Sequence, residues 1–258
     1  MRIRNPAVLA ALPCLATCNT FPESVLMSGT VFDAPYDDGQ GAAGVTVTTR
    51  DGSLDVFSDT VTGEDGAFEV EVASQQHLYV ELSGEGRTTT LFAGEVGAYD
   101  MEVAQGVLYV RPDSWAAYLV AEFGACAETA LAAEGAGTGV IEGEVRLYAS
   151  GVNPPDAAIL GNAWAEARRA DGTTWEACYL DDAGEADPDA IYTGARGRFA
   201  IFGVPADALL LLVSYGDRDA ADADDTAAGP WYSWVYEVLM VDGAVAPFYP
   251  AWVEQVGS

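Results

Sequence analysis

The feature that most constrains the fold of this chain is a short motif that occurs twice. The pattern T-G-x-x-G-x-F covers Thr62–Phe68 and again Thr193–Phe199, and apolar residues follow each copy. The glycines allow the positive φ angles of a tight chain reversal, and the phenylalanine becomes the first inward side chain of the next strand. Each copy therefore predicts a turn between two strands, and the recurrence predicts one structural unit used twice.

Three further segments recur in the same order around the motif. MSGTVFD corresponds to IEGEVRLY, VTVTTRDGSLDVFS to NAWAEARRADGTTWEACYL, and HLYVELSG to ALLLLVSYG. In the first copy Phe68, Val70 and Val72 alternate with glutamates, which is the period of a strand with one buried and one solvated face. The sequence predicts a mainly β protein with two antiparallel β-sandwich domains, at residues 27–111 and 139–258.

The segment between the two predicted domains has a different texture. Residues 112–138 are rich in alanine and begin with Pro112, and a glycine-rich stretch ends them. Apolar residues recur in it at the spacing of one helix face, and this stripe consists of Trp115, Leu119, Phe123, Cys126 and Ala130. Such a stripe predicts a helix that packs on a sheet, followed by a linker.

The quoted repeats carry a resemblance to a known family. Its residues are Gly29–Val31, Gly44–Val47, the two motif copies and Gly203–Ala206, and they resemble the carboxypeptidase regulatory-like family. The resemblance implies a transthyretin-like (prealbumin-like, Ig-like) β-sandwich over most of residues 27–104 and 139–215. It implies no catalytic role here, because enzymes associated with such sandwiches use several histidines and this chain has only His77.

The N-terminus has the layout of an export signal. Arg2 and Arg4 precede an apolar run that ends at Cys18, and a small residue stands before that cysteine, as in a bacterial lipobox. We expect residues 1–17 to be a signal peptide, Cys18 to be lipidated, and residues 18–26 to form a tether. Secretion without lipid and an ordinary buried segment are the alternatives. We expect no later segment apolar enough to span a bilayer.

Cysteine usage is consistent with export. If Cys14 leaves with the signal and Cys18 takes lipid, only Cys126 and Cys178 remain. In an oxidising compartment they are expected to form a disulfide, with two separate buried thiols as the alternative. The chain entropy of such a loop corresponds to about 4 kcal/mol before any strain is subtracted.

The charge balance argues against negatively charged binding partners. The formal net charge is −29, from 40 acids and 11 bases, and every base is an arginine. Such a polyanion repels nucleic acids and anionic lipid headgroups, so neither is expected to bind. A histidine-rich zinc site needs more imidazoles than the single His77 supplies, and no nucleophile motif lies near His77 for a histidine-dependent triad. We expect His77 to be a structural or surface residue.

Three weaker constellations could bind or react. Asp217, Asp219, Asp222 and Asp224 could supply oxygen ligands to calcium, and a solvated loop explains them as well. Trp231, Trp234 and Trp252 could stack on a glycan, unless they pack in the core or between domains. Glu142 and Glu144 share a strand face and could act as paired carboxylates of a hydrolase, or could simply face solvent.

The sequence favours a non-enzymatic lipoprotein of the cell envelope that acts as a structural or interaction module. The expected partner is an envelope protein or glycan, and no cofactor is expected apart from a possible calcium ion. A carbohydrate-binding surface protein and an uncharacterised hydrolase are the alternative functions. The membrane contact would be made only through the N-terminal lipid.

Overall fold

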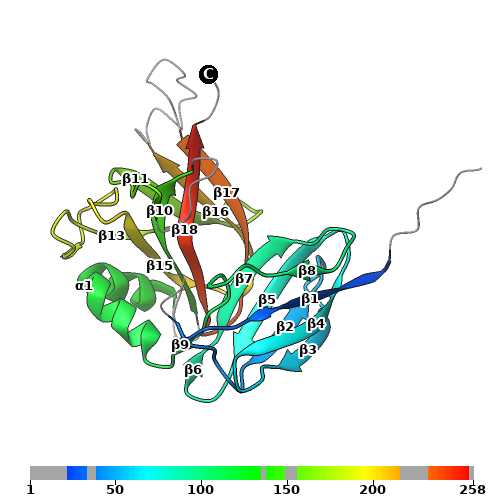
Figure 1. The fold of residues 1–258 in the computed structure, drawn as a ribbon. Helices are drawn as coiled ribbons and strands as arrows, with labels where there is room; N and C mark the ends of the chain where they lie inside the picture. Colours follow the sequence, from blue (N-terminus) through cyan, green and yellow to red (C-terminus); the bar gives the residue numbers. More distant parts are fainter. Residues whose placement is uncertain (1–21, 34–38, 135–137, 149–155, 216–231, 256–258) are drawn as a thin grey trace, which may run out of the picture.

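The fold is mainly β, with eighteen strands and one helix among the described residues (Figure 1). The structure is a computed structural model, and it describes residues 22–33, 39–134, 138–148, 156–215 and 232–255. We call residues 24–112 the first half and residues 139–255 the second half.

The first half is built from two facing sheets. Its strands are β1 (Ser24–Thr30), β2 (Thr46–Arg50), β3 (Val56–Val61), β4 (Ala67–Ala73), β5 (His77–Ser83), β6 (Arg87–Thr88), β7 (Thr90–Glu95), β8 (Met101–Glu102) and β9 (Arg111–Pro112). One sheet has the order β4-β1-β8, and the strands of the other pair in the order β3-β2-β5-β7. The apolar face of each sheet turns inward, so that Met27, Phe68 and Val80 share one buried core.

The second half repeats this construction with longer strands. They are β10 (Gly139–Leu147), β11 (Ala163–Arg168), β12 (Thr174–Glu176), β13 (Cys178–Leu180), β14 (Ala186–Asp187), β15 (Arg198–Val204), β16 (Asp207–Tyr215), β17 (Tyr232–Met240) and β18 (Val245–Gln255). The order β18-β10-β15-β13-β14 forms one layer and β12-β11-β16-β17 the other. Their core contains Ile141, Phe199 and Leu211.

The two halves share one pattern of strand pairing. β1 is antiparallel to β4 and parallel to β8, and β10 is antiparallel to β15 and parallel to β18 in the same way. β2 lies between β3 and β5, and β11 lies between β12 and β16. The register also matches, because Gly29 lies opposite Phe68 and Gly143 lies opposite Phe199. The segments that recur in the sequence therefore fold into corresponding strands.

The motif threonines explain why the pattern recurs. Thr62 and Thr193 are both buried, and each hydroxyl bridges the chain before the motif by donating to one backbone carbonyl and accepting from one backbone N–H. The partners are Ala42 O (2.6 Å) and Val45 N (2.9 Å) for Thr62, and Leu160 O (3.0 Å) and Ala163 N (3.1 Å) for Thr193. A side-chain hydroxyl thus satisfies backbone groups that the sheet leaves unpaired.

The second glycine of each motif copy is required by its backbone. Gly66 has φ +78° and Gly197 has φ +63°, the left-handed region that side chains disfavour. A Cβ on Gly66 would lie 2.4 Å from the Val31 carbonyl oxygen, and one on Gly197 would lie 2.9 Å from that of Val145. Both turns therefore need glycine for conformation and for space.

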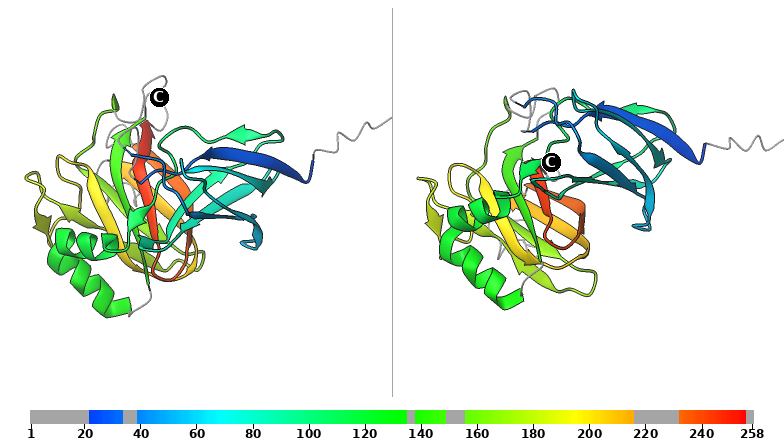
Figure 2. Two further views of the ribbon diagram at one scale, coloured as in Figure 1. Left: turned by 60° about the horizontal axis from the view of Figure 1, so that its bottom comes forward. Right: turned by 90° about the horizontal axis from the view of Figure 1, so that it is seen from below.

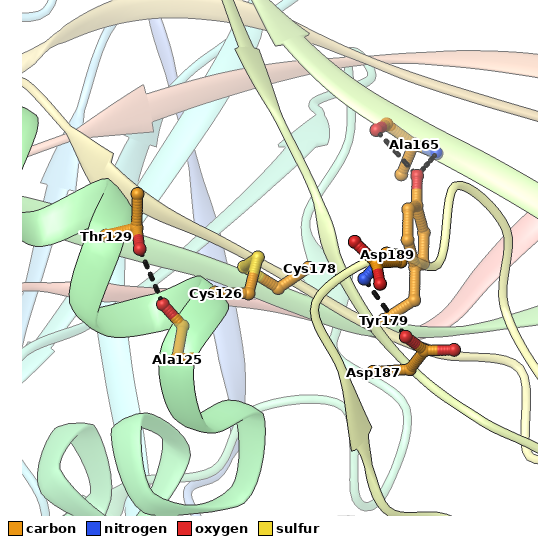
Figure 3. Close-up of a disulfide and its surroundings, with 8 residues drawn as sticks. All are labelled: Ala125, Cys126, Thr129, Ala165, Cys178, Tyr179, Asp187 and Asp189. Carbon is orange, nitrogen blue, oxygen red and sulfur yellow. Dashed lines mark hydrogen bonds between the residues drawn. A yellow bond between two sulfur atoms is a disulfide. The ribbon is translucent and has the colours of Figure 1, made fainter.

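The predicted helix forms as α1 (Trp115–Glu134) and covers a sheet of the second half. Leu119 and Phe123 are buried against β13 and β15, and Cys126 is joined to Cys178 of β13 (Figure 3). The expected disulfide is thus confirmed. The helix bends at Gly124, where φ is +53° (Figure 2).

By length and composition alone, Trp115–Ala133 could cross a membrane, with a mean hydropathy of 1.2. The expectation that no later segment reaches this threshold was therefore wrong. Alanines raise the hydropathy of the outer face, while the inner face is tied to β13 by packing and by the disulfide.

The halves contact each other directly through their strands. Thr90 of β7 pairs in parallel with Val245 of β18, and the Val245 N–H donates to the Thr89 carbonyl at 2.9 Å. Leu91 of β7 is buried in the core of the second half. α1 connects the halves along the chain, but the joint itself is made by β7, β17 and β18 (Figure 1).

Candidate functional site

A groove of about 500 Å³ lies at the joint between the halves, within the size range of small-ligand pockets. β5 and β7 form one wall, and β17 and β18 form the other. We call it the joint groove, and its lining residues are His77, Tyr79, Ala93, Gly94, Glu95, Val235, Tyr236, Glu237 and Phe248.

Strand alternation places the polar residues of the first half in the joint groove. Leu78 and Val80 of β5 point into the first core, so His77 and Tyr79 point outward. Glu95 of β7 lies directly opposite His77 in the ladder, on the same face. One face of two neighbouring strands therefore presents an imidazole, a phenol and a carboxylate.

Glu237 of β17 completes this polar group from the second half. Its Oε2 lies 3.4 Å from His77 Nδ1 and accepts a hydrogen bond from the Tyr79 hydroxyl at 3.4 Å. The side chains of Glu237 and His77 are 46% and 48% exposed, so the carboxylate remains accessible to a ligand. Burial, together with the charge of Glu237 and its hydrogen bond, raises the pKa of Tyr79.

Aromatic rings line the apolar part of the joint groove. Tyr236 packs on Phe248 with ring centroids 5.0 Å apart and planes tilted by 59°. The Tyr236 hydroxyl donates to the Trp252 carbonyl at 3.2 Å and accepts from the Trp252 N–H. Burial raises the pKa of Tyr236 well above its ordinary value. These contacts fix the ring where β17 and β18 separate.

A second group of polar residues lies between α1, β9 and β10. We call it the Glu142 cluster, formed by Arg111, Trp115, Glu142, Arg198 and Tyr249. The Glu142 side chain is fully buried, and its two oxygens accept hydrogen bonds from Trp115 Nε1 and the Tyr249 hydroxyl, each at 2.7 Å. Arg111 Nε and Arg198 NH2 lie 3.8 Å and 3.6 Å from the carboxylate.

The Glu142 cluster combines a buried carboxylate with two arginines, and Arg198 also donates to Glu122 of α1 at 3.1 Å. Burial raises the pKa of Glu142, and Arg111, the two donated hydrogen bonds and Arg198 oppose that shift. Trp115 and both guanidiniums can only donate, so the groups around the carboxyl oxygens of Glu142 are donors and positive charges. Arg111 lies 4.0 Å from the Trp115 ring centroid, a cation–π contact that brings the end of the first half onto α1 and β10.

The structure therefore assigns Glu142 and Glu144 to separate interactions. Glu144 pairs with Arg146, while Glu142 is held in its cluster, so neither carboxylate is poised to share a substrate with the other. The interpretation of Glu142 as a residue that faces solvent was wrong, because α1 covers that face of β10.

Several predicted site residues lie outside the described part of the chain. These are Cys18, Trp231 and the calcium candidates Asp217, Asp219, Asp222 and Asp224, and of Trp234 only the backbone is described. Trp252 is partly buried, with its ring 5.7 Å from that of Tyr148, and it does not line the joint groove. Among the described residues, no group of three or more acidic, cysteine or histidine side chains is arranged to hold a metal ion.

Sequence reasoning missed the joint groove. His77 was expected to be structural or surface-exposed, and its position beside Glu237 depends on strands that lie far apart in the sequence. The alternation of HLYVEL does show that His77, Tyr79 and Glu81 share one face. No local signal indicates that β17 lies opposite that face.

Comparisons with known proteins give only distant structural similarity. No protein-family profile matches the chain, and no curated protein sequence matches it. The chain is structurally similar to the TIE protein of Bacillus anthracis (9% identity, TM-score 0.28), covering 90% of this chain and 34% of that one, so it spans about a third of that protein. It is also similar to the minor pilin GBS52 of Streptococcus agalactiae (11%, 0.29, 92% and 98% covered) and to the shaft pilin SpaA of Lactobacillus rhamnosus GG (12%, 0.25, 92% and 98%). Identities and TM-scores are both low, so the function of this chain rests on its own residues.

Proposed function

We propose that this chain is an exported, lipid-anchored and non-enzymatic module that acts as a spacer and interaction surface at the cell envelope. In this proposal two β-sandwich domains, derived from one unit, form a single rigid body. The observation that carries it is the repeated pairing pattern of the two halves together with their direct joint through β7 and β18.

The rigid joint supports a structural role. A backbone pairing, the buried Leu91 and the Glu142 cluster all connect the first half with the second. Breaking a buried ion pair leaves an uncompensated charge, so the Glu142 cluster resists hinge motion that would separate Arg111 from Glu142. A body joined in this way transmits position and force, as a spacer must.

The direction of the chain supports an anchored arrangement. β1 begins at the end of the first half that lies away from the second half (Figure 1). A lipid on Cys18 would therefore hold the first half near the membrane and present the second half and the joint groove outward. The engaged state of Glu142 favours this role over the hydrolase alternative.

Intact-mass measurement on protein purified from its own membranes tests the proposed export and lipid anchoring. The expected mass is that of a chain starting at Cys18 with added acyl groups, and reduction should add two hydrogens by opening the Cys126–Cys178 bond. A Cys18→Ser variant should leave the membrane fraction, whereas the matched Cys14→Ser variant should stay in it. An unprocessed chain starting at Met1, or membrane retention of Cys18→Ser, would contradict the proposal.

A further inference from the structure

Two strand edges border the joint groove. In the ladders of the described residues, Ala93, Gly94 and Glu95 of β7 pair only with β5, and Val235 and Glu237 of β17 pair only with β16. Such edges present backbone groups to which an extended chain can add as a further strand.

The charge of the joint groove selects the side chains of such a strand. Glu95 and Glu237 bring two carboxylates, and His77 is the only basic side chain among the lining residues. Arg50, on the strand next to β5, is paired with Glu81 at 3.0 Å and adds no free positive charge. The chain as a whole carries −29, so its field attracts cations over a longer range.

The rings of the groove do not present a platform for a sugar. Tyr236 and Phe248 pack on each other at a tilt of 59°, and the Tyr236 hydroxyl is fixed by Trp252. These rings instead form an apolar wall beside the carboxylates, which suits the aliphatic stem of a lysine or arginine.

We propose that the joint groove binds an extended, basic segment of a partner protein. The segment adds to the open edge of β7 at Ala93–Glu95, and its lysine or arginine heads lie between Glu95 and Glu237. This assignment rests on the proposed function as an interaction module and names the class of partner, a protein with a lysine- or arginine-bearing extended segment.

The absence of lysine from the chain allows a sharp test. A carbodiimide joins carboxylates to amines, so this protein has no lysine through which it could crosslink to itself. The probe is a short labelled peptide of alternating valine and lysine, which places all lysines on one face of a strand. With the full chain and its disulfide intact, crosslinked peptide should map to Glu95 and Glu237. Fluorescence anisotropy with the same peptide should give saturable binding.

A matched pair of variants separates the groove from general charge attraction. Glu95→Gln with Glu237→Gln should weaken peptide binding by about tenfold, since each partly exposed ion pair contributes up to about fivefold. Glu69→Gln with Glu71→Gln removes the same charge from the exposed face of β4 and should change binding by less than about twofold. Circular dichroism of both variants checks that they are folded.

Each outcome decides the proposal. Equal weakening by the two double variants would show nonspecific attraction and overturn it, as would crosslinks spread over the surface. Binding of free lysine amide as tight as that of the peptide would show a single-amine site and overturn the strand addition. The intact-mass test of export does not depend on peptide binding. A protein that is lipidated at Cys18 but does not bind the peptide would therefore contradict only the assignment of the joint groove.

Discussion

The same sheet face is solvated in the first half and buried in the second. On β4, Glu69 and Glu71 point outward to solvent. At the corresponding positions of β15 stand Ala200 and Phe202, both covered by α1. A strand buried on both faces loses its alternation and becomes a continuous apolar run, as in RFAIFGV. Because α1 packs on this face, the second half has three layers where the first half has two.

Covering that face also changed what its polar residue must do. Ser28 of β1 and Glu142 of β10 occupy equivalent positions in the two halves, because each directly precedes the glycine that lies opposite the motif phenylalanine. Ser28 is partly buried and small, whereas Glu142 is fully buried and needs two hydrogen-bond donors and two arginines. A charge removed from water has to be compensated, and here the compensation comes from Arg111 at the end of the first half.

The largest expected loss of stability comes from removing the Glu142 carboxyl group. Glu142→Ala leaves Arg111 buried without a carboxylate partner and leaves Arg198 with Glu122 alone, so it should lower the free energy of unfolding by about 3–5 kcal/mol. Ser28→Ala, at the corresponding position, should change it by less than about 0.5 kcal/mol. Urea unfolding measures both, and similar losses in the two variants would contradict the comparison.

Removal of the disulfide should act on one half only. The Cys126–Cys178 bond closes a loop of 52 residues, so the double variant Cys126→Ala/Cys178→Ala should lose up to about 4 kcal/mol. Hydrogen exchange should show lost protection in α1 and β13 and unchanged protection in β1 and β4. Uniform loss of protection in both halves would mean that they unfold as one cooperative unit.

The motif threonines sharpen the comparison by an effect that should be equal in both halves. Thr62→Val and Thr193→Val each leave a buried backbone N–H and carbonyl without the hydroxyl. Each variant should therefore lose about 1–3 kcal/mol of unfolding free energy. Thr174→Val, at an exposed position of β12, is the control and should stay within about 0.5 kcal/mol. A large loss for only one motif threonine would show that the two turns are not equivalent.

The smallest effect is expected at alkaline pH. Burial raises the pKa of Tyr236 and of Tyr249, so the folded state keeps protons that the unfolded chain loses above about pH 10. Stability from these groups is fully present below pH 10 and falls as the pH rises, by at most about 1.4 kcal/mol per group and pH unit. Tyr236→Phe should reduce this slope, and Tyr99→Phe, at an exposed position, should not. An unchanged slope in Tyr236→Phe would contradict the assignment.

Local sequence patterns predicted the elements that depend on neighbouring residues. The helix at Trp115–Glu134 lies within the predicted 112–138, and the Cys126–Cys178 bond was predicted from cysteine usage. The first strand begins at Ser24, three residues before the predicted domain start at residue 27. The burial of Glu142 had a signal that alternation alone could have revealed, because RFAIFGV lacks the polar outer face that FEVEV has.

The amino-acid sequence by itself determined the mainly β class, the two equivalent turns and the inward helix stripe, because turn chemistry and periodicity act between residues close along the chain. Only the tertiary structure decided that Glu237 would meet His77 and Tyr79, and that Arg111 would meet Glu142. Tyr79 and Glu237 are 158 residues apart, so their contact depends on how β7 docks against β17 and β18. That docking is set by the summed fit of two large surfaces, and no short stretch of sequence carries it.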